Sequence, residues 1–157
     1  MKIAFKAIAI VLICLTTGGC QTAPVAESKD SVLVQMFKWW NQAYLKDQPF
    51  TEEGFAQYFT DDIVFELNGK RSSEGIKALT ERFNKIKDTY HIIEILLPMK
   101  EEFRSDNRIF TYHLNRGQTR KGDSWGPTSH IMGYVDIKDE KIDFLSFANH
   151  DEEVEEE

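Results

Sequence analysis

The sequence predicts a single domain of the α+β class, with helices first and an antiparallel sheet last. Two periodicities predict it. Apolar residues recur at three- and four-residue steps in segments before residue 90, which is helical spacing, and alternate with period two in long segments after it, which is strand spacing. From Ser31 to Asn149 no composition break, repeat or low-complexity segment interrupts the chain. About 120 residues suit one domain with one hydrophobic core.

Three helices are expected in the first half of this domain. The first runs from about Asp30 to Lys46 and has an aromatic-rich apolar face. Thr51 offers an N-cap for a short second helix, and Ser73 offers one for a third. The residues that define the apolar faces of the first and third helices are Val32, Leu33, Met36, Phe37, Trp40, Ala43 and Tyr44, and Ile76, Leu79, Phe83 and Ile86.

Strands are expected around a hairpin and then in the second half of the domain. Residues 63–67 form a first strand, and Asn68-Gly69 predicts a two-residue turn because both residues tolerate positive φ. Asp61 and Asp62 are interpreted as turn formers before that strand, not as a catalytic acid pair. The four long strands predicted from period-two alternation are 90–103, 108–117, 129–137 and 141–148.

Residues 1–19 have the features of a secretory signal peptide. Lys2 and Lys6 precede an apolar core, residues 7–15, which is far shorter than the roughly 20 residues that span a bilayer. The sequence ending in Gly18-Gly19-Cys20 resembles the lipobox of bacterial lipoproteins. That resemblance implies cleavage before Cys20, attachment of lipid to its thiol and a location in the cell envelope. The alternatives are an ordinary signal peptide with a free Cys20, or an uncleaved N-terminal helix.

The segments on either side of the domain are polar. Residues 20–30, which begin with the lipidated cysteine, predict a flexible tether, and residues 150–157 an acidic, disordered tail. In a Gram-negative cell, Gln21 after the cysteine implies an outer-membrane lipoprotein that faces the periplasm. Cys14 leaves with the signal peptide, so the mature chain keeps one cysteine and forms no internal disulfide.

Net charge and motif content exclude several classes of function. The formal net charge is −7, and removal of the two lysines of the signal makes it more negative, so a nucleic-acid partner is excluded. No histidine or cysteine cluster has metal-ligand spacing, and no glycine-rich phosphate loop is present. The sequence therefore predicts neither a metal site nor a cofactor.

Two stretches carry a resemblance to a known family. FTDDIVFELNG, residues 59–69, and SSEGIKALTERF, residues 72–83, together with the order of the elements, resemble the nuclear transport factor 2-like superfamily and its SnoaL-like branch. The resemblance implies a cone, in which a strongly curved antiparallel sheet wraps around the three N-terminal helices. It also implies a pocket at the open end of the cone and a homodimer formed through the outer face of the sheet.

Alternation along the strands indicates which side chains face that pocket. His130, Met132 and Tyr134 share one face of a long strand, and Tyr112 shares a face with Phe110 on its neighbour. The residues expected to line the pocket are Trp39, Trp40, Tyr44, Phe59, Phe65, Phe83, Tyr112, His130, Met132 and Tyr134. The alternative is that these side chains simply fill the core.

The other face of the same strands is expected to be the outer one. It would carry Thr111, His113 and Asn115. Trp125 lies in the long loop between two strands and suggests a lid, a partner contact or an anchor that faces the membrane.

The catalytic set of steroid isomerases with this fold, an aspartate base with a tyrosine and a protonated aspartate, is missing. By the resemblance, its positions fall at Leu67, near Trp39 and near Met132, and none of these side chains can do that chemistry. Glu66 and His130 are the remaining candidates for a general acid and base.

The sequence therefore predicts a membrane-anchored, non-catalytic binder of a small apolar or amphipathic ligand. The alternatives are an envelope module that binds a protein partner or dimerises, and an enzyme of the SnoaL-like type that uses Glu66 and His130.

Overall fold

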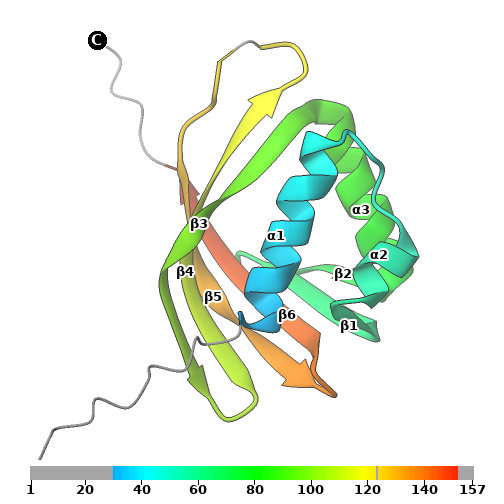
Figure 1. The fold of residues 1–157 in the computed structure, drawn as a ribbon, viewed down its shortest axis with the longest axis vertical. Coiled ribbons are helices and arrows are strands. Elements are labelled where there is room, and N and C mark those ends of the chain that lie inside the picture. The colour runs from blue at the N-terminus through cyan, green and yellow to red at the C-terminus, as the bar shows by residue number, and fades with distance from the viewer. Residues whose placement is uncertain (1–29, 123, 152–157) are drawn as a thin grey trace, which may run out of the picture.

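The computed structural model describes residues 30–122 and 124–151, which form three helices and one six-stranded sheet (Figure 1). In chain order the elements are α1 (Val32–Leu45), α2 (Glu52–Ala56), β1 (Phe59–Leu67), β2 (Lys70–Glu74), α3 (Ile76–Thr89), β3 (Tyr90–Ser105), β4 (Arg108–Thr119), β5 (Ser129–Lys138) and β6 (Lys141–Asp151). The predicted α+β class is confirmed. The predicted signal peptide, Cys20 and nearly all of the tether lie outside the described residues.

The sheet is strongly curved and holds the helices on one side. Its strand order is β2-β1-β6-β5-β4-β3, and α1, α2 and α3 all lie within its concave face (Figure 1). All neighbouring pairs are antiparallel except β1 and β6, which are parallel. The predicted antiparallel pairing therefore holds for every neighbouring pair except this one. Only strands joined by a hairpin must run antiparallel, whereas most of the domain separates β1 from β6 in the chain.

Of the two predicted helix caps, that of Thr51 is confirmed, and α1 has a cap at Ser31 that was not predicted. The Ser31 side chain accepts a hydrogen bond from the amide of Val34 at the start of α1, and the Thr51 side chain does so from Gly54 in α2. The prediction for α3 was wrong, because its N-cap is Gly75, which has no side chain to cap with. Ser73 lies in β2, opposite Phe65 of β1.

The turns and strand ends differ from the predictions in two places. Asn68 and Gly69 form the predicted turn, with φ of 51° and 71°. Asp61 and Asp62, however, are exposed residues within β1, which begins at Phe59, and so are not turn formers. At the other end of the domain β6 continues to Asp151, three residues beyond the predicted end of this strand at residue 148, because it pairs with β5 up to Ser129. The rest of the predicted tail lies outside the described residues.

The hydrophobic core lies between the helices and the concave face of the sheet. Its buried members come from the three helices, the connection between α1 and α2, and every strand except β2. The fully buried large side chains are Phe37, Phe55, Leu33, Ile63, Ile109, Ile142 and Val135. All residues of this described core fall between Leu33 and Leu145. A chain that begins at Gln21 therefore keeps every one of these contacts. None of the helices in the described residues is long and apolar enough to cross a membrane.

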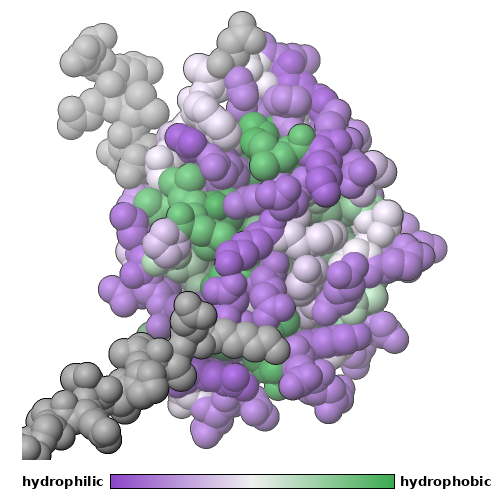
Figure 2. Space-filling model, in the orientation of Figure 1, coloured by the Kyte–Doolittle hydropathy of each residue, from purple (hydrophilic) through white to green (hydrophobic). Residues whose placement is uncertain are grey.

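The outer surface of the helical side is mostly polar. Figure 2, which shows the molecule in the orientation of Figure 1, has hydrophilic side chains over most of this face, with apolar patches between them. This is the distribution expected of helices that turn one apolar stripe inward.

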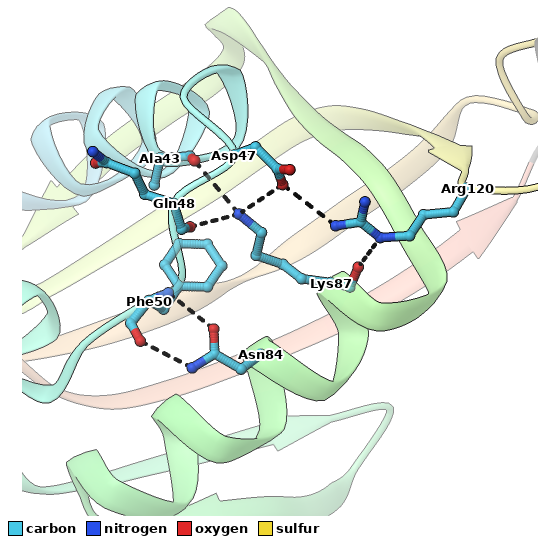
Figure 3. Close-up of polar contacts among 7 residues, drawn as sticks. All are labelled: Ala43, Asp47, Gln48, Phe50, Asn84, Lys87 and Arg120. Atoms are coloured by element: carbon cyan, nitrogen blue, oxygen red, sulfur yellow. Dashed lines mark hydrogen bonds and ion pairs between the residues drawn. The ribbon is translucent and has the colours of Figure 1, made fainter.

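A buried lysine joins the ends of α1 and α3 to the segment that follows β4 (Figure 3). The Lys87 side chain is 7% exposed, and its Nζ donates to the carbonyl oxygens of Gln48, at 2.6 Å, and Ala43, at 3.5 Å. Arg120 donates to the Lys87 carbonyl at 2.8 Å and to Asp47 at 3.3 Å. Burial lowers the pKa of Lys87, and Asp47 opposes this effect. These contacts fix the helices relative to the β4–β5 connection.

Candidate functional site

A cavity of about 650 Å³ lies between the helices and the concave face of the sheet. Its buried wall is formed by apolar side chains from α1, α2, α3 and the strands, including Phe37, Phe55 and Ile63. The exposed lining residues include Trp125, Pro127 and Asp151, which belong to the β4–β5 connection and the end of β6. The cavity therefore opens to solvent at this end of the cone. Its volume is within the range of small-molecule sites, roughly 300 to 1,000 Å³.

His113 forms part of the cavity wall and is 2% exposed. Its ring packs against Phe37, at 4.6 Å between centroids, and Phe147, at 5.3 Å. Its Nδ1 is 3.2 Å from the Thr111 hydroxyl. Burial lowers the pKa of His113 from 6.5 to about 4. The imidazole is therefore neutral at pH 7, and the inner wall presents no buried charge at this position.

Four of the residues predicted for the pocket line the cavity: Trp40, Phe59, Phe65 and Phe83. Trp39 and Tyr44 do not. The Trp39 ring packs between Phe50, Phe55 and Tyr58, with centroid distances of 5.1 to 5.5 Å. Tyr44 is 2% exposed and packs against Trp40 and Phe50. Both residues fill the core, which is the alternative that the sequence left open.

The predicted faces of β4 and β5 are reversed in the structure. Tyr112, His130, Met132 and Tyr134 lie on the outer face, where Met132 is 56% exposed and none of the four lines the cavity. The inner face carries Ile109, Thr111, His113 and Asn115 of β4 with Ile131 and Val135 of β5. Period-two alternation separates two faces without saying which is buried. On β4 the aromatic Phe110 and Tyr112 lie on the outer face and the polar Thr111 and His113 on the buried one, so aromatic content indicated the wrong face.

Glu66 and His130, the candidate acid and base, both lie outside the cavity lining. The Tyr112 hydroxyl is 2.7 Å from Nδ1 of His130, and the two rings stack. Glu66 pairs with Ser146 of β6, which pairs with Tyr134 of β5, four residues from His130. Strand spacings place the two residues about 16 Å apart along the sheet. Concerted acid–base catalysis needs both groups within hydrogen-bond reach of one substrate, so this pair cannot supply it.

The sequence did not indicate Arg82 of α3, which lines the cavity beside Phe65. Its guanidinium carbon lies 5.6 Å from the centroid of the Phe65 ring. Helical spacing could have indicated that Arg82 lies near the cavity. It follows Leu79 by three residues and directly precedes Phe83, and both of these residues line the cavity. No group of three or more histidine, cysteine, aspartate or glutamate side chains that could hold a metal ion occurs in residues 30–122 and 124–151.

The loop between β4 and β5 lies against the opening of the cavity. Trp125 is 40% exposed and lines the cavity, and the Arg116 guanidinium lies 4.2 Å from its ring centroid. Arg116 is in turn paired with Glu94 of β3 at 2.7 Å, and the amide of Gly126 donates to the Gly117 carbonyl. These contacts hold the indole at the edge of the opening. The alternatives for Trp125 from the sequence were a lid, a partner contact or an anchor that faces the membrane.

Solved structures with this arrangement include nuclear transport factor 2-like proteins. One from Exiguobacterium sp. 255-15, of unknown function, is 20% identical, with a TM-score of 0.59 over 79% of this chain and 100% of that one. A putative SnoaL-like polyketide cyclase from Jannaschia sp. CCS1 is 7% identical, with a TM-score of 0.56 over 76% and 84%. An LEH-like epoxide hydrolase from M. tuberculosis is 11% identical, with a TM-score of 0.53 over 77% and 83%.

The fold is therefore the nuclear transport factor 2-like fold that the sequence resemblance implied. No family model matches the sequence, and no curated protein is significantly similar to it. At these identities the likeness extends to the fold alone, and proteins that share it include enzymes as well as proteins of unknown function.

Proposed function

We propose that the protein binds a small apolar or amphipathic molecule within the cone and performs no chemistry on it. The observation that supports this most strongly is the cavity of about 650 Å³, whose inner wall is built from aromatic and aliphatic side chains. Removal of apolar surface from water is the main driving force for binding in such a site. The neutral state of His113 supports the same conclusion, because an apolar ligand meets no buried charge there.

An enzymatic role finds no support in the geometry. Glu66 and His130 face away from the cavity, and His113, the titratable side chain in its buried wall, is a poor base because burial lowers its pKa to about 4. A general base works best when its pKa lies near the working pH.

Replacing Ile131 with tryptophan tests the binding proposal. Ile131 is 5% exposed and faces the cavity from β5, so the larger ring would occupy ligand volume. Met132→Trp is the matched control, because the next residue of the same strand points outward. The neutral probe N-phenyl-1-naphthylamine, followed by its fluorescence with the chain from Gln21, should bind the wild type and Met132→Trp alike. Ile131→Trp should weaken binding about tenfold or more, equivalent to about 1.4 kcal/mol.

Equal affinity of the probe for the two tryptophan variants would contradict the proposal. It would mean that the probe binds elsewhere, for example on the outer face of the sheet. The circular dichroism of both variants serves as the check that each has folded.

The binding domain is proposed to work at a membrane, anchored by lipid on Cys20 in the cell envelope. The support is the sequence of residues 1–20 alone. Labelling cells with radioactive palmitate should mark the full chain and should not mark Cys20→Ala. A wild-type chain that takes up no label would exclude the anchor.

A second candidate function is self-association through the outer face of the sheet. Phe103 and Met132 are 61% and 56% exposed there. Phe103 stacks on Phe110, and the Arg108 guanidinium lies 3.9 Å from the centroid of the Tyr134 ring. Exposed apolar groups of this kind are typical of interfaces. Sedimentation equilibrium of the wild type and of Met132→Glu tests the interface, and a wild type that stays monomeric at high concentration would exclude it.

A further inference from the structure

Arg82 differs from the other arginines of the domain in that no oxygen atom of the described residues accepts a hydrogen bond from its side chain. Of the six arginines in residues 30–122 and 124–151, Arg71, Arg108, Arg116 and Arg120 pair with carboxylates. Arg104 donates to the carbonyl of Asp106. The guanidinium of Arg82 instead contacts the face of Phe65, and its Nε is buried without a hydrogen-bond partner among the described residues.

Arg82 is also the one lysine or arginine in the cavity lining that the structure describes. Among the described lining residues Asp151 alone carries a carboxylate, which accepts a hydrogen bond from Ser129 in the neighbouring strand. A buried donor without a partner costs free energy that an acceptor would recover. A guanidinium favours a planar anion, since its N–H groups can donate two parallel bonds to a carboxylate or a similar oxyanion.

We propose that the ligand is an amphipathic anion whose acid group is bound by Arg82 and whose apolar body lies along the buried wall of the cavity. This inference rests on the proposed binding function and adds the chemical class of the ligand. The position of Arg82 suits an amphipathic anion. Arg82 belongs to α3, beside Phe83 and Ile86, so its charged group adjoins an apolar lining. The chain as a whole has a net charge of −7, so its overall charge repels an anion, and binding depends on this local contact.

A pair of probes with one ring skeleton separates charge from apolar burial. N-phenyl-1-naphthylamine is neutral, and 8-anilinonaphthalene-1-sulfonate carries a sulfonate on the same skeleton. Titration of each into the chain from Gln21 measures the selectivity for the anion as a ratio of dissociation constants. The wild type should prefer the sulfonate by about tenfold, as expected for a charge-assisted hydrogen bond.

Arg82→Gln should remove most of that preference and leave the affinity for the neutral probe within about twofold. Lys85→Gln is the matched control, since it removes the same charge from an exposed position of α3 that does not line the cavity. It should leave the affinity for both probes unchanged. Should Arg82→Gln fail to fold, the wild type still provides a test. Decanoate should displace the neutral probe at about a tenth of the concentration that decanol needs.

The outcomes separate this inference from the proposed function. If the neutral probe enters the cavity but the wild type shows no preference for the sulfonate, or Arg82→Gln keeps that preference, Arg82 is not the anion site and only this inference fails. If neither probe binds the wild type in a way that Ile131→Trp prevents, the binding function itself fails.

Discussion

Replacing Gly133 with alanine is expected to lower the free energy of unfolding by about 3 kcal/mol, the upper part of the range for an overpacked interior. A Cβ at this position would lie 2.0 Å from the carbonyl oxygen of Ser146 and 3.0 Å from Cα of Phe147. Both are backbone atoms of β6, so the clash is relieved only by moving one strand away from the other. Because glycine stands here, the Phe147 ring can cross β5 and contribute to the cavity wall.

Urea denaturation of the chain from Gln21 measures this effect. Gly122→Ala is the matched control, because among the described residues its added methyl group meets the Thr119 hydroxyl alone, at 3.1 Å, and that hydroxyl can rotate away. That control should change stability by no more than about 0.5 kcal/mol. A Gly133→Ala protein whose midpoint matches that of Gly122→Ala would show that β5 and β6 do not approach each other as closely as described.

The second large effect is a decrease in the free energy of unfolding at acidic pH. Burial lowers the pKa of His113 to about 4, whereas the histidine of an unfolded chain titrates near 6.5. Between these two values the unfolded chain binds a proton that the folded chain does not. The contribution of His113 to stability is therefore complete above pH 6.5 and is lost as the pH falls toward 4. Over that interval the loss amounts to about 3 kcal/mol, at 1.36 kcal/mol per pH unit.

His113→Gln should remove this part of the pH dependence. The side chains described around His113 are Phe37, Phe147 and Thr111, none of which titrates in this range. The free energy of unfolding measured at pH 7, 6 and 5 should fall less steeply in the variant than in the wild type. His91→Gln, at an exposed position of β3, is the control and should keep the wild-type slope. Equal slopes for all three proteins would mean that His113 is protonated in the folded state.

The sequence predicted which segments form helices and strands better than it predicted how these elements are oriented relative to one another. Helical spacing and strand alternation are local signals, and so is the Asn68-Gly69 turn, whose φ angles are both positive. The parallel pairing of β1 with β6 is not local. It depends on how the whole sheet curves, which no segment of the chain encodes by itself.

The candidate site was predicted less well for the same reason. Trp40, Phe59, Phe65 and Phe83 line the cavity, because they lie on helix faces or strand positions whose apolar side is unambiguous. On β4 and β5 the prediction of cavity residues depended on which face of each strand was taken as the buried one, and the wrong face was taken. The aromatic residues there pack against one another on the outer face, as Phe110 does against Tyr134, while the buried face holds the polar Thr111 and His113.

The role of Arg82 in the cavity could not be predicted from the sequence. An arginine on an amphipathic helix usually extends its charged end into water, so the sequence pattern alone gives it no role. Its contact with Phe65 depends on the packing of α3 against β1, and its lack of an acceptor becomes visible only when every neighbouring side chain is placed.

Native mass spectrometry of the chain from Gln21, purified without detergent, tests the central claim that the cone holds a small molecule. The wild type and Met132→Trp should each carry one bound small molecule that is released on unfolding, and Ile131→Trp should appear at the mass of the polypeptide alone. If the wild type also appears at that mass, and still does after incubation with N-phenyl-1-naphthylamine, the cavity is not a binding site and the account is contradicted.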